Sequence, residues 1–124
     1  MFVINYNNIN NQFMLRFPEF ELFFEEQFKL WGAHDIPAHC FLGDILNEYV
    51  SGLLRENNNK QQIEKIFNFY EELACSNDLE VRNLLQVTLL EYLWDEVIVH
   101  KTALEYMLPE TRTINNKVGV YLQG

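Results

Sequence analysis

The chain has 124 residues, 48% of them hydrophobic and 15% aromatic, which predicts one compact domain over residues 1–124. Eighteen acidic residues against nine basic ones give a formal net charge of −9, which repels phosphate backbones, so we expect no nucleic-acid partner. No stretch approaches the ~18 apolar residues of a membrane span, and the start lacks the basic segment of a signal peptide, so we expect neither membrane insertion nor secretion.

The first predicted helix lies within Asn5–Arg16, and it must end before Pro18 because proline disfavours helical geometry in the preceding residue. A second helix is predicted to begin at Pro18 and to stop at Gly32, with glutamates in its first turn. Its aromatic residues share one face and are predicted to be buried: Phe20, Phe23, Phe24, Phe28 and Trp31. Its charged residues lie largely opposite.

Two more amphipathic helices are predicted over Ala38–Arg55 and Lys60–Cys75. The next segment, Ser76–Glu96, reads SNDLEVRNLLQVTLLEYLWDE and is apolar on almost every side of a helix. Because such a helix is normally surrounded by protein, we expect it at the centre, with neighbours on at least two sides. A capping box of Asn77 and Glu80 is predicted to begin it.

A last helical stretch, HKTALEYML, ends at Pro109. Residues 109–124 leave three alternatives open after a first helical turn, namely a strand, an irregular tail or more helix. No other segment is rich in strand or hairpin signals. The sequence therefore predicts the all-α class, as a compact single-domain helical bundle of five to seven helices.

Candidate metal ligands gather in one short stretch, where His34, Asp35, His39 and Cys40 lie within seven residues. A proline separates the histidines, and their spacing matches no usual zinc pattern, so we expect neither a metal nor a cofactor. Cys40 and Cys75 form no CxxC pair, which favours free thiols in a cytoplasmic protein. No phosphate-binding loop, GxSxG or HExxH motif is present, so a binding protein is favoured over an enzyme.

Acidic side chains form the candidate partner-binding site. Glu91 and Asp95 are neighbours at i, i+4 on a helix, and adjacent carboxylates accept bidentate hydrogen bonds from arginine. Acid–base catalysis by this pair would need a second wall across a cleft, for which no pattern exists. The predicted contact residues are Glu21, Glu25, Glu26, Glu91, Asp95 and Glu96.

Two resemblances extend these predictions. NDLEVRNLLQVTLLEYLWD is similar to the second helix of a HEAT repeat, which implies antiparallel helix pairing; the residues concerned are Asp78, Val81, Arg82, Leu85 and Leu89. The segments RFPEF, FLGDILNEYV, KIFNFYEELACSNDLEVRNLLQVTLLEYLWDE and ALEYMLPET resemble a family of small uncharacterised bacterial all-helical domains. That resemblance implies an all-α single domain similar to the immunity proteins encoded beside secreted toxins, with no catalytic residues.

The leading functional expectation is a cytoplasmic immunity protein or antitoxin that covers the active site of a basic toxin such as a nuclease. Nuclease surfaces are cationic, so a strongly acidic inhibitor associates with them rapidly. The alternative is a small helical scaffold or adaptor that recognises partners through apolar surface. A homodimer whose interface covers the predicted helix Ser76–Glu96, which is apolar on almost every side, would give the same sequence pattern.

Overall fold

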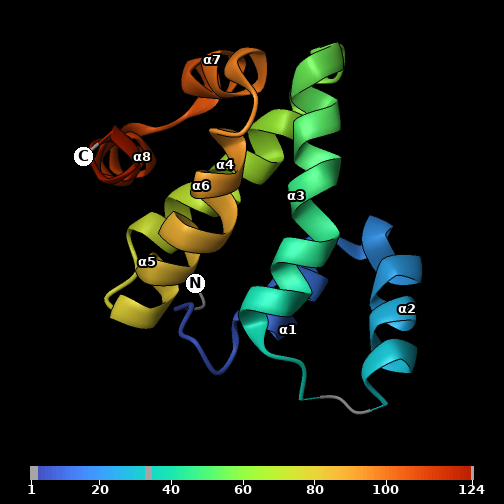
Figure 1. The fold of residues 1–124 in the computed structure, drawn as a ribbon. Coiled ribbons are helices and arrows are strands. Elements are labelled where there is room, and N and C mark those ends of the chain that lie inside the picture. Colours follow the sequence, from blue (N-terminus) through green and yellow to red (C-terminus); the bar gives the residue numbers. More distant parts are fainter. Residues whose placement is uncertain (1–2, 33–34, 124) are drawn as a thin grey trace.

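The computed structural model describes residues 3–32 and 35–123, and within these ranges it consists of helices and connecting turns with no strand (Figure 1). The helical elements are α1 (Ile9–Arg16), η1 (Pro18–Phe20), α2 (Glu21–Trp31), α3 (Ala38–Glu56), α4 (Lys60–Ala74), α5 (Leu79–Leu84), η2 (Leu85–Leu90), α6 (Glu91–Leu93), α7 (Val97–Tyr106) and α8 (Pro109–Gln123). Since α5, η2 and α6 are continuous, the described residues form seven main helices and one short 3₁₀ turn, η1. The predicted all-α class is confirmed.

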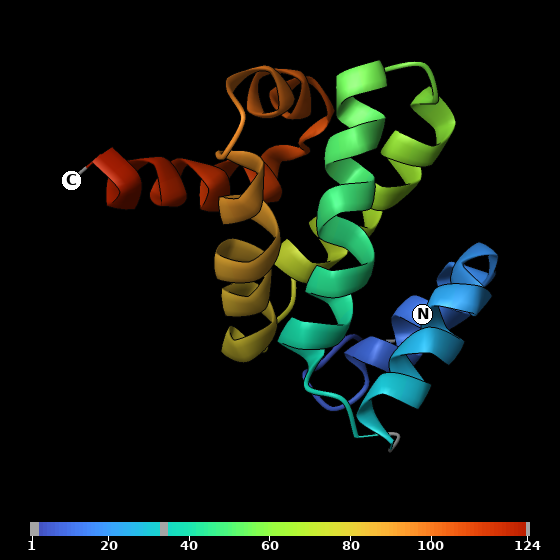
Figure 2. The same cartoon turned by 45° about the vertical axis from the view of Figure 1, so that its right-hand side comes forward.

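The helices are arranged around α3 and the continuous α5–η2–α6 helix. In Figures 1 and 2, α3 lies between α2 on one side and the α5–α6 helix on the other. The C-terminal helix α8 lies on the side opposite α2 in both views, and Figure 2 shows its end projecting from the bundle. None of the helices in the described ranges combines the length and the apolar character needed to cross a membrane.

An aromatic core holds α1, α2, α3 and α4 together, with the ring of Phe13 at its centre. The Phe13 ring centroid lies 4.9 Å from Phe17, 5.8 Å from Phe24, 6.5 Å from Phe41 and 5.5 Å from Phe69. All five side chains are buried. Edge-to-face and offset contacts at these distances add specific ring–ring attraction to the burial of apolar area.

The aromatic face predicted for α2 is only partly buried. Phe20 and Phe24 face the core, but Phe23 and Trp31 are each 43% exposed, so the prediction was wrong for these two. Only one narrow side of α2 meets α1 and α3, and residues at the edge of the aromatic face lie beyond that contact. Phe23 keeps one neighbour, the ring of Phe20 at 5.8 Å.

The central helix changes its hydrogen bonding over Leu85–Leu90, where it is a π-helix. A π-helix bonds i to i+5 and so brings residues five apart to nearly the same side. The leucine pairs 84–85 and 89–90 are five apart, and all four side chains are buried. The change of period explains why the sequence looks apolar on almost all sides when an ordinary α-helix is assumed. As predicted, neighbours lie on more than one side: α3, α4 and α8 all pack against η2.

One side of the central helix nevertheless remains open to solvent. Leu79 is 70% exposed and Val87 is 43% exposed.

The central helix begins one residue later than predicted, because Asp78 rather than Asn77 is its N-cap. The carboxylate of Asp78 accepts a hydrogen bond from the backbone N–H of Glu80 at 3.0 Å. The second oxygen of Asp78 accepts from the backbone N–H of Tyr6, which ties the N-terminal segment to this helix.

Residues 109–123 form a helix, which settles the three alternatives for this region. Its first turn is capped from another helix, because the carboxylate of Glu71 in α4 accepts hydrogen bonds there. Glu71 binds both the backbone N–H and the hydroxyl of Thr111 at 2.8 Å, and the N–H of Glu110 at 3.1 Å. These bonds satisfy donors that every helix start leaves without a partner inside the helix.

Candidate functional site

The acidic residues remain at the surface, and most of them have no partner within the described chain. None of the eighteen carboxylates is buried. Six of them form ion pairs or side-chain hydrogen bonds, namely Glu19, Glu48, Glu71, Glu72, Asp78 and Glu96. The other twelve make no such bond to the residues that the structure describes. Most of the net charge of −9 is therefore displayed to solvent.

The predicted strip on α6 comprises Glu91 in that helix together with Asp95 and Glu96 in the turn that follows it, and it is partly neutralised by the protein itself. Arg55 of α3 binds both carboxylate oxygens of Glu96, with the Nε to Oε2 distance at 2.8 Å. This hydrogen bond lowers the pKa of Glu96. Arg55 also reaches Glu48, whose second oxygen accepts a hydrogen bond from Tyr92. Of the three predicted residues here, only Glu91 and Asp95 lack a partner, so this strip is a weaker candidate for binding a cation.

The three predicted residues on α2 are all exposed, and their carboxylates have no partner among the described residues. Glu26 lies between Leu22 and Leu30 in an i, i+4, i+8 row, and these leucines are 73% and 75% exposed. Glu21 and Glu25 form the adjacent row. Together with the half-exposed rings described above, they make a mixed acidic and apolar surface. We call this surface the outer face of α2, and it consists of Glu21, Leu22, Phe23, Glu25, Glu26, Lys29, Leu30 and Trp31, so three carboxylates and one exposed lysine share it.

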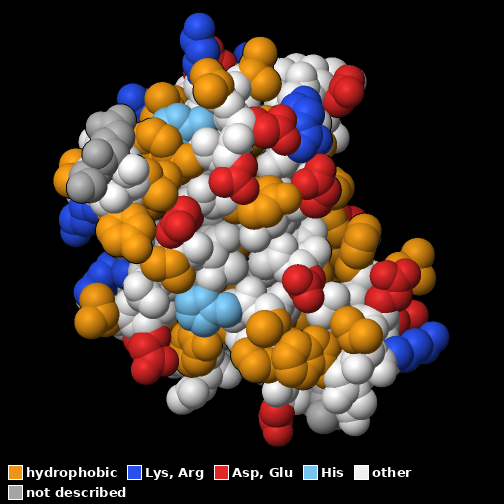
Figure 3. All heavy atoms as spheres, viewed as in Figure 1, with side chains coloured by type: hydrophobic (Ala, Val, Ile, Leu, Met, Phe, Trp, Pro, Cys, Tyr) orange, Lys and Arg blue, Asp and Glu red, His pale blue; other side chains and the backbone are white. Residues whose placement is uncertain are grey.

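The two predicted acidic clusters do not form one site. The outer face of α2 and the strip on α6 lie on opposite sides of α3 (Figures 1 and 2). In the space-filling view, acidic side chains are scattered over the visible face, and at the right-hand edge, over α2, they lie beside hydrophobic side chains and a basic one (Figure 3). The combination of exposed apolar side chains with acidic neighbours was not predicted, because the sequence does not show which side of α2 meets the core.

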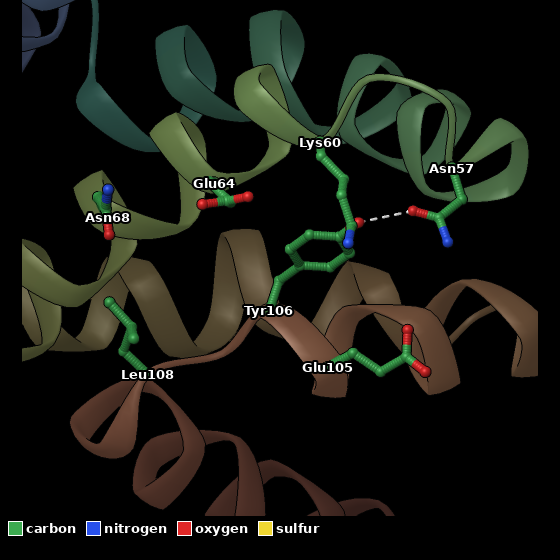
Figure 4. Close-up of a pocket in the computed structure, with 7 residues that line it drawn as sticks. All are labelled: Asn57, Lys60, Glu64, Asn68, Glu105, Tyr106 and Leu108. Carbon is green, nitrogen blue, oxygen red and sulfur yellow. Dashed lines mark hydrogen bonds between the residues drawn. The ribbon is translucent and has the colours of Figure 1, made fainter.

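A surface groove of about 480 Å³ lies between α4, the turn that precedes it and the end of α7. Figure 4 shows Tyr106 pointing into it, with its hydroxyl donating a hydrogen bond to Asn57 Oδ1 at 2.7 Å. Its other lining residues are Lys60, Glu64, Asn68, Glu105 and Leu108. This lining contains no histidine, cysteine or serine, so the groove has none of the usual nucleophile and base pairs.

The described histidines have structural contacts. His39 forms a hydrogen bond with the hydroxyl of Thr88, which joins the start of α3 to η2. Of the stretch considered for a metal, His34 lies outside the described residues. Among the described residues, no three histidine, cysteine, aspartate or glutamate side chains are grouped so that they could hold a metal ion.

A buried polar network joins the end of α6 to α7 and α8. The amide of Asn115 accepts a hydrogen bond from Trp94 Nε1 at 3.0 Å, and its nitrogen lies 3.0 Å from His100 Nε2. Asn115 is buried, and burial of His100 lowers the pKa of that imidazole. The sequence gives no local sign of this network, whose members are up to 21 residues apart.

The chain was compared with known families, curated proteins and solved structures. No curated protein and no solved structure shows significant similarity to it, so the resemblances to immunity proteins and to HEAT repeats stay predictions. Residues 10–121 match the model of a family described as a domain of unknown function, DUF7674. Because this match covers most of the chain, the protein belongs to the DUF7674 family.

Proposed function

We propose that the protein is a protein-binding module that recognises a basic partner protein through the outer face of α2. We further propose that this partner is a cognate toxin, which the protein neutralises by covering its active site. The observation that carries the proposal is the position of Glu21, Glu25 and Glu26 beside two leucines that are more than 70% exposed. These three carboxylates have no partner in the part of the chain that the structure describes.

The apolar side chains of this face can supply affinity. Binding energy at protein interfaces concentrates in a few aromatic and aliphatic anchors that become fully buried, surrounded by polar groups. Phe23 and Trp31 are partly exposed aromatic side chains of this kind, and complete burial of an exposed leucine contributes roughly 1.5–3 kcal/mol. The face therefore offers anchors as well as charge.

The carboxylates can orient a basic partner and increase its rate of association. Pairs of adjacent carboxylates accept bidentate hydrogen bonds from arginine, which is abundant on surfaces that bind polyanions. The net charge of −9 attracts a cationic protein over distances of about 8–10 Å at physiological to moderate ionic strength. Association with a basic toxin is accordingly expected to be fast and to slow as salt is added.

A second candidate function is a helical scaffold that recognises partners through apolar surface alone. The exposed side of the central helix favours it, because Leu79 and Val87 are exposed apolar side chains away from the outer face of α2. The two candidates differ in their dependence on charge. Reversal of the α2 carboxylates abolishes binding in the first and leaves it nearly unchanged in the second.

The test uses the immobilised protein as bait in an extract of the native host, followed by kinetics with the captured partner. The variant Glu25→Lys/Glu26→Lys removes the acidic neighbours of Leu22, and Glu91→Lys/Asp95→Lys is the matched control on α6. We expect a basic partner whose association rate falls with ionic strength and whose binding is lost only with the α2 variant. Equal binding by the α2 variant and the wild type would contradict the proposal.

A further inference from the structure

The C-terminal turns of α8 expose apolar side chains on neighbouring positions. Val120 and Tyr121 are 73% and 74% exposed, and Leu122 is also exposed. Lys117 precedes Val120 and Tyr121 by three and four residues, so these three side chains share one side of the helix. Val118, on another side, is buried against the bundle. This helix end thus has apolar groups facing both the core and the solvent, a pattern typical of a helix covered by protein on several sides.

The same part of α8 is locally basic, although the protein as a whole is acidic. From residue 112 to residue 123 the chain contains Arg112 and Lys117 and no acidic residue. Lys117 forms no ion pair with any residue that the structure describes. At the left-hand edge of Figure 3, where Figure 1 places α8, basic side chains lie beside hydrophobic ones.

The two ends of the molecule therefore carry complementary surfaces. The outer face of α2 combines exposed leucines and aromatic rings with three carboxylates and one lysine, Lys29, so its net charge is negative. The end of α8 combines exposed apolar side chains with Lys117, which forms no ion pair within the described part of the chain. We propose that the outer face of α2 in one copy binds the C-terminal turns of α8 in a second copy. Since α2 and α8 lie on opposite sides of the molecule (Figures 1 and 2), the contact forms between copies and not within one.

A contact between two different faces has a definite geometric consequence. Each copy that uses its α2 face keeps its own α8 end free for the next copy, so the association is head to tail. The net charge of −9 on each copy opposes it at long range. Salt at physiological strength screens charges beyond about 8 Å, whereas Lys117 and the carboxylates of Glu25 and Glu26 would meet at shorter distance. The local attraction and the apolar burial then outweigh the screened repulsion.

This self-association and the proposed binding of a basic partner use the same α2 face, so they exclude each other on one copy. A basic partner would displace the second copy. The two proposals are nevertheless tested separately, because self-association needs no other protein. A monomeric protein would overturn the head-to-tail contact and leave the partner proposal unchanged.

The experiment is sedimentation velocity of the full chain from low to high micromolar concentration at physiological ionic strength. Two variants each remove one surface: Leu22→Ser/Leu30→Ser on α2 and Val120→Ser/Tyr121→Ser on α8. All four side chains are at least 70% exposed, so both variants should keep the fold, which circular dichroism checks. The wild type is expected to form species larger than a dimer, and each variant alone is expected to stay monomeric.

The decisive sample is an equimolar mixture of the two variants. The α2 variant retains its α8 end, and the α8 variant retains its α2 face, so the mixture forms dimers of one copy of each and grows no further. Val97→Ser/Ile98→Ser on α7 changes two side chains that are 85% and 65% exposed, and this variant is expected to associate like the wild type. A wild type that stays monomeric, a mixture that stays monomeric, or loss of association in the α7 control would each overturn the proposal.

Discussion

The imidazole of His100 stacks on the indole of Trp94, with their ring centroids 3.8 Å apart, and both rings are bound to the single amide of Asn115. The indole N–H can only donate, so it occupies the amide oxygen, and the amide nitrogen must then donate to Nε2 of His100. That nitrogen is therefore unprotonated. Burial of the imidazole is the main cause that lowers the pKa of His100. The neutral form of His100 thus helps to hold α8 against α6 and α7.

The first prediction concerns the pH dependence of stability. In the unfolded chain a histidine takes up a proton near pH 6.5, whereas the folded protein resists protonation of His100 until lower pH. The unfolded state therefore binds more protons in this window, and the free energy of unfolding decreases as the pH falls from about 7 through 6.5. Urea denaturation at several pH values measures it. The variant His100→Gln should show a flatter profile, and an equal slope in both proteins would contradict the assignment to His100.

The second prediction concerns the close contact between Gly119 and Trp94. A Cβ atom at Gly119 would lie 2.8 Å from Cη2 of Trp94, so Gly119→Ala forces the indole away from its hydrogen bond. Overpacking of this kind costs about 1–3 kcal/mol of the free energy of unfolding. Gly52→Ala in α3 is the matched control, because its Cβ would meet nothing within 4 Å. The control should be neutral or stabilising by up to about 1 kcal/mol in the same urea experiment.

Helix ends that depend on one or two local residues could be predicted from the sequence. Gly32 ends α2 with φ at 65°, a left-handed conformation that glycine adopts without strain, and η1 begins at Pro18 as expected. Features made by distant residues could not be predicted. The cap of α8 comes from Glu71, about 40 residues earlier, and the partner of Glu96 is Arg55, 41 residues earlier. Neither pairing leaves a local pattern.

The sequence predicted which acidic residues form the candidate site, but it did not predict which apolar side chains lie exposed beside them. The glutamates of α2 are exposed as expected, yet Phe23 and Trp31 were assigned to the core because periodicity shows which residues share a face and not which of them a neighbouring helix covers. For the π-helical segment, the prediction assumed the wrong helical period. With an ordinary α-helical period, Leu85 and Leu90 point to different sides, whereas the π-helical period brings both to nearly the same buried side.

The third prediction tests the corrected burial of α2 with two adjacent residues. Phe24 is 6% exposed and packs on Phe13 and Phe41, so Phe24→Ala should cost roughly 3–5 kcal/mol. Phe23 is 43% exposed and touches the core only at its edge, so Phe23→Ala should cost about 1 kcal/mol or less. Thermal and urea unfolding of both variants provide the comparison. Similar losses in the two variants would restore the original prediction that both rings belong to the core.

The fourth prediction concerns the cap that α4 provides for α8. Glu71→Ala removes the acceptor for two backbone N–H groups and for the buried hydroxyl of Thr111, and the loss of a cap of this kind costs roughly 1–2 kcal/mol. Glu72→Ala is the control, since its exposed ion pair with Arg16 contributes at most about 1 kcal/mol. Hydrogen exchange should accelerate selectively in the first turns of α8 in the Glu71 variant. Exchange that is equally fast in both variants, or unchanged in both, would show that α8 is held by its apolar side chains and not by this carboxylate.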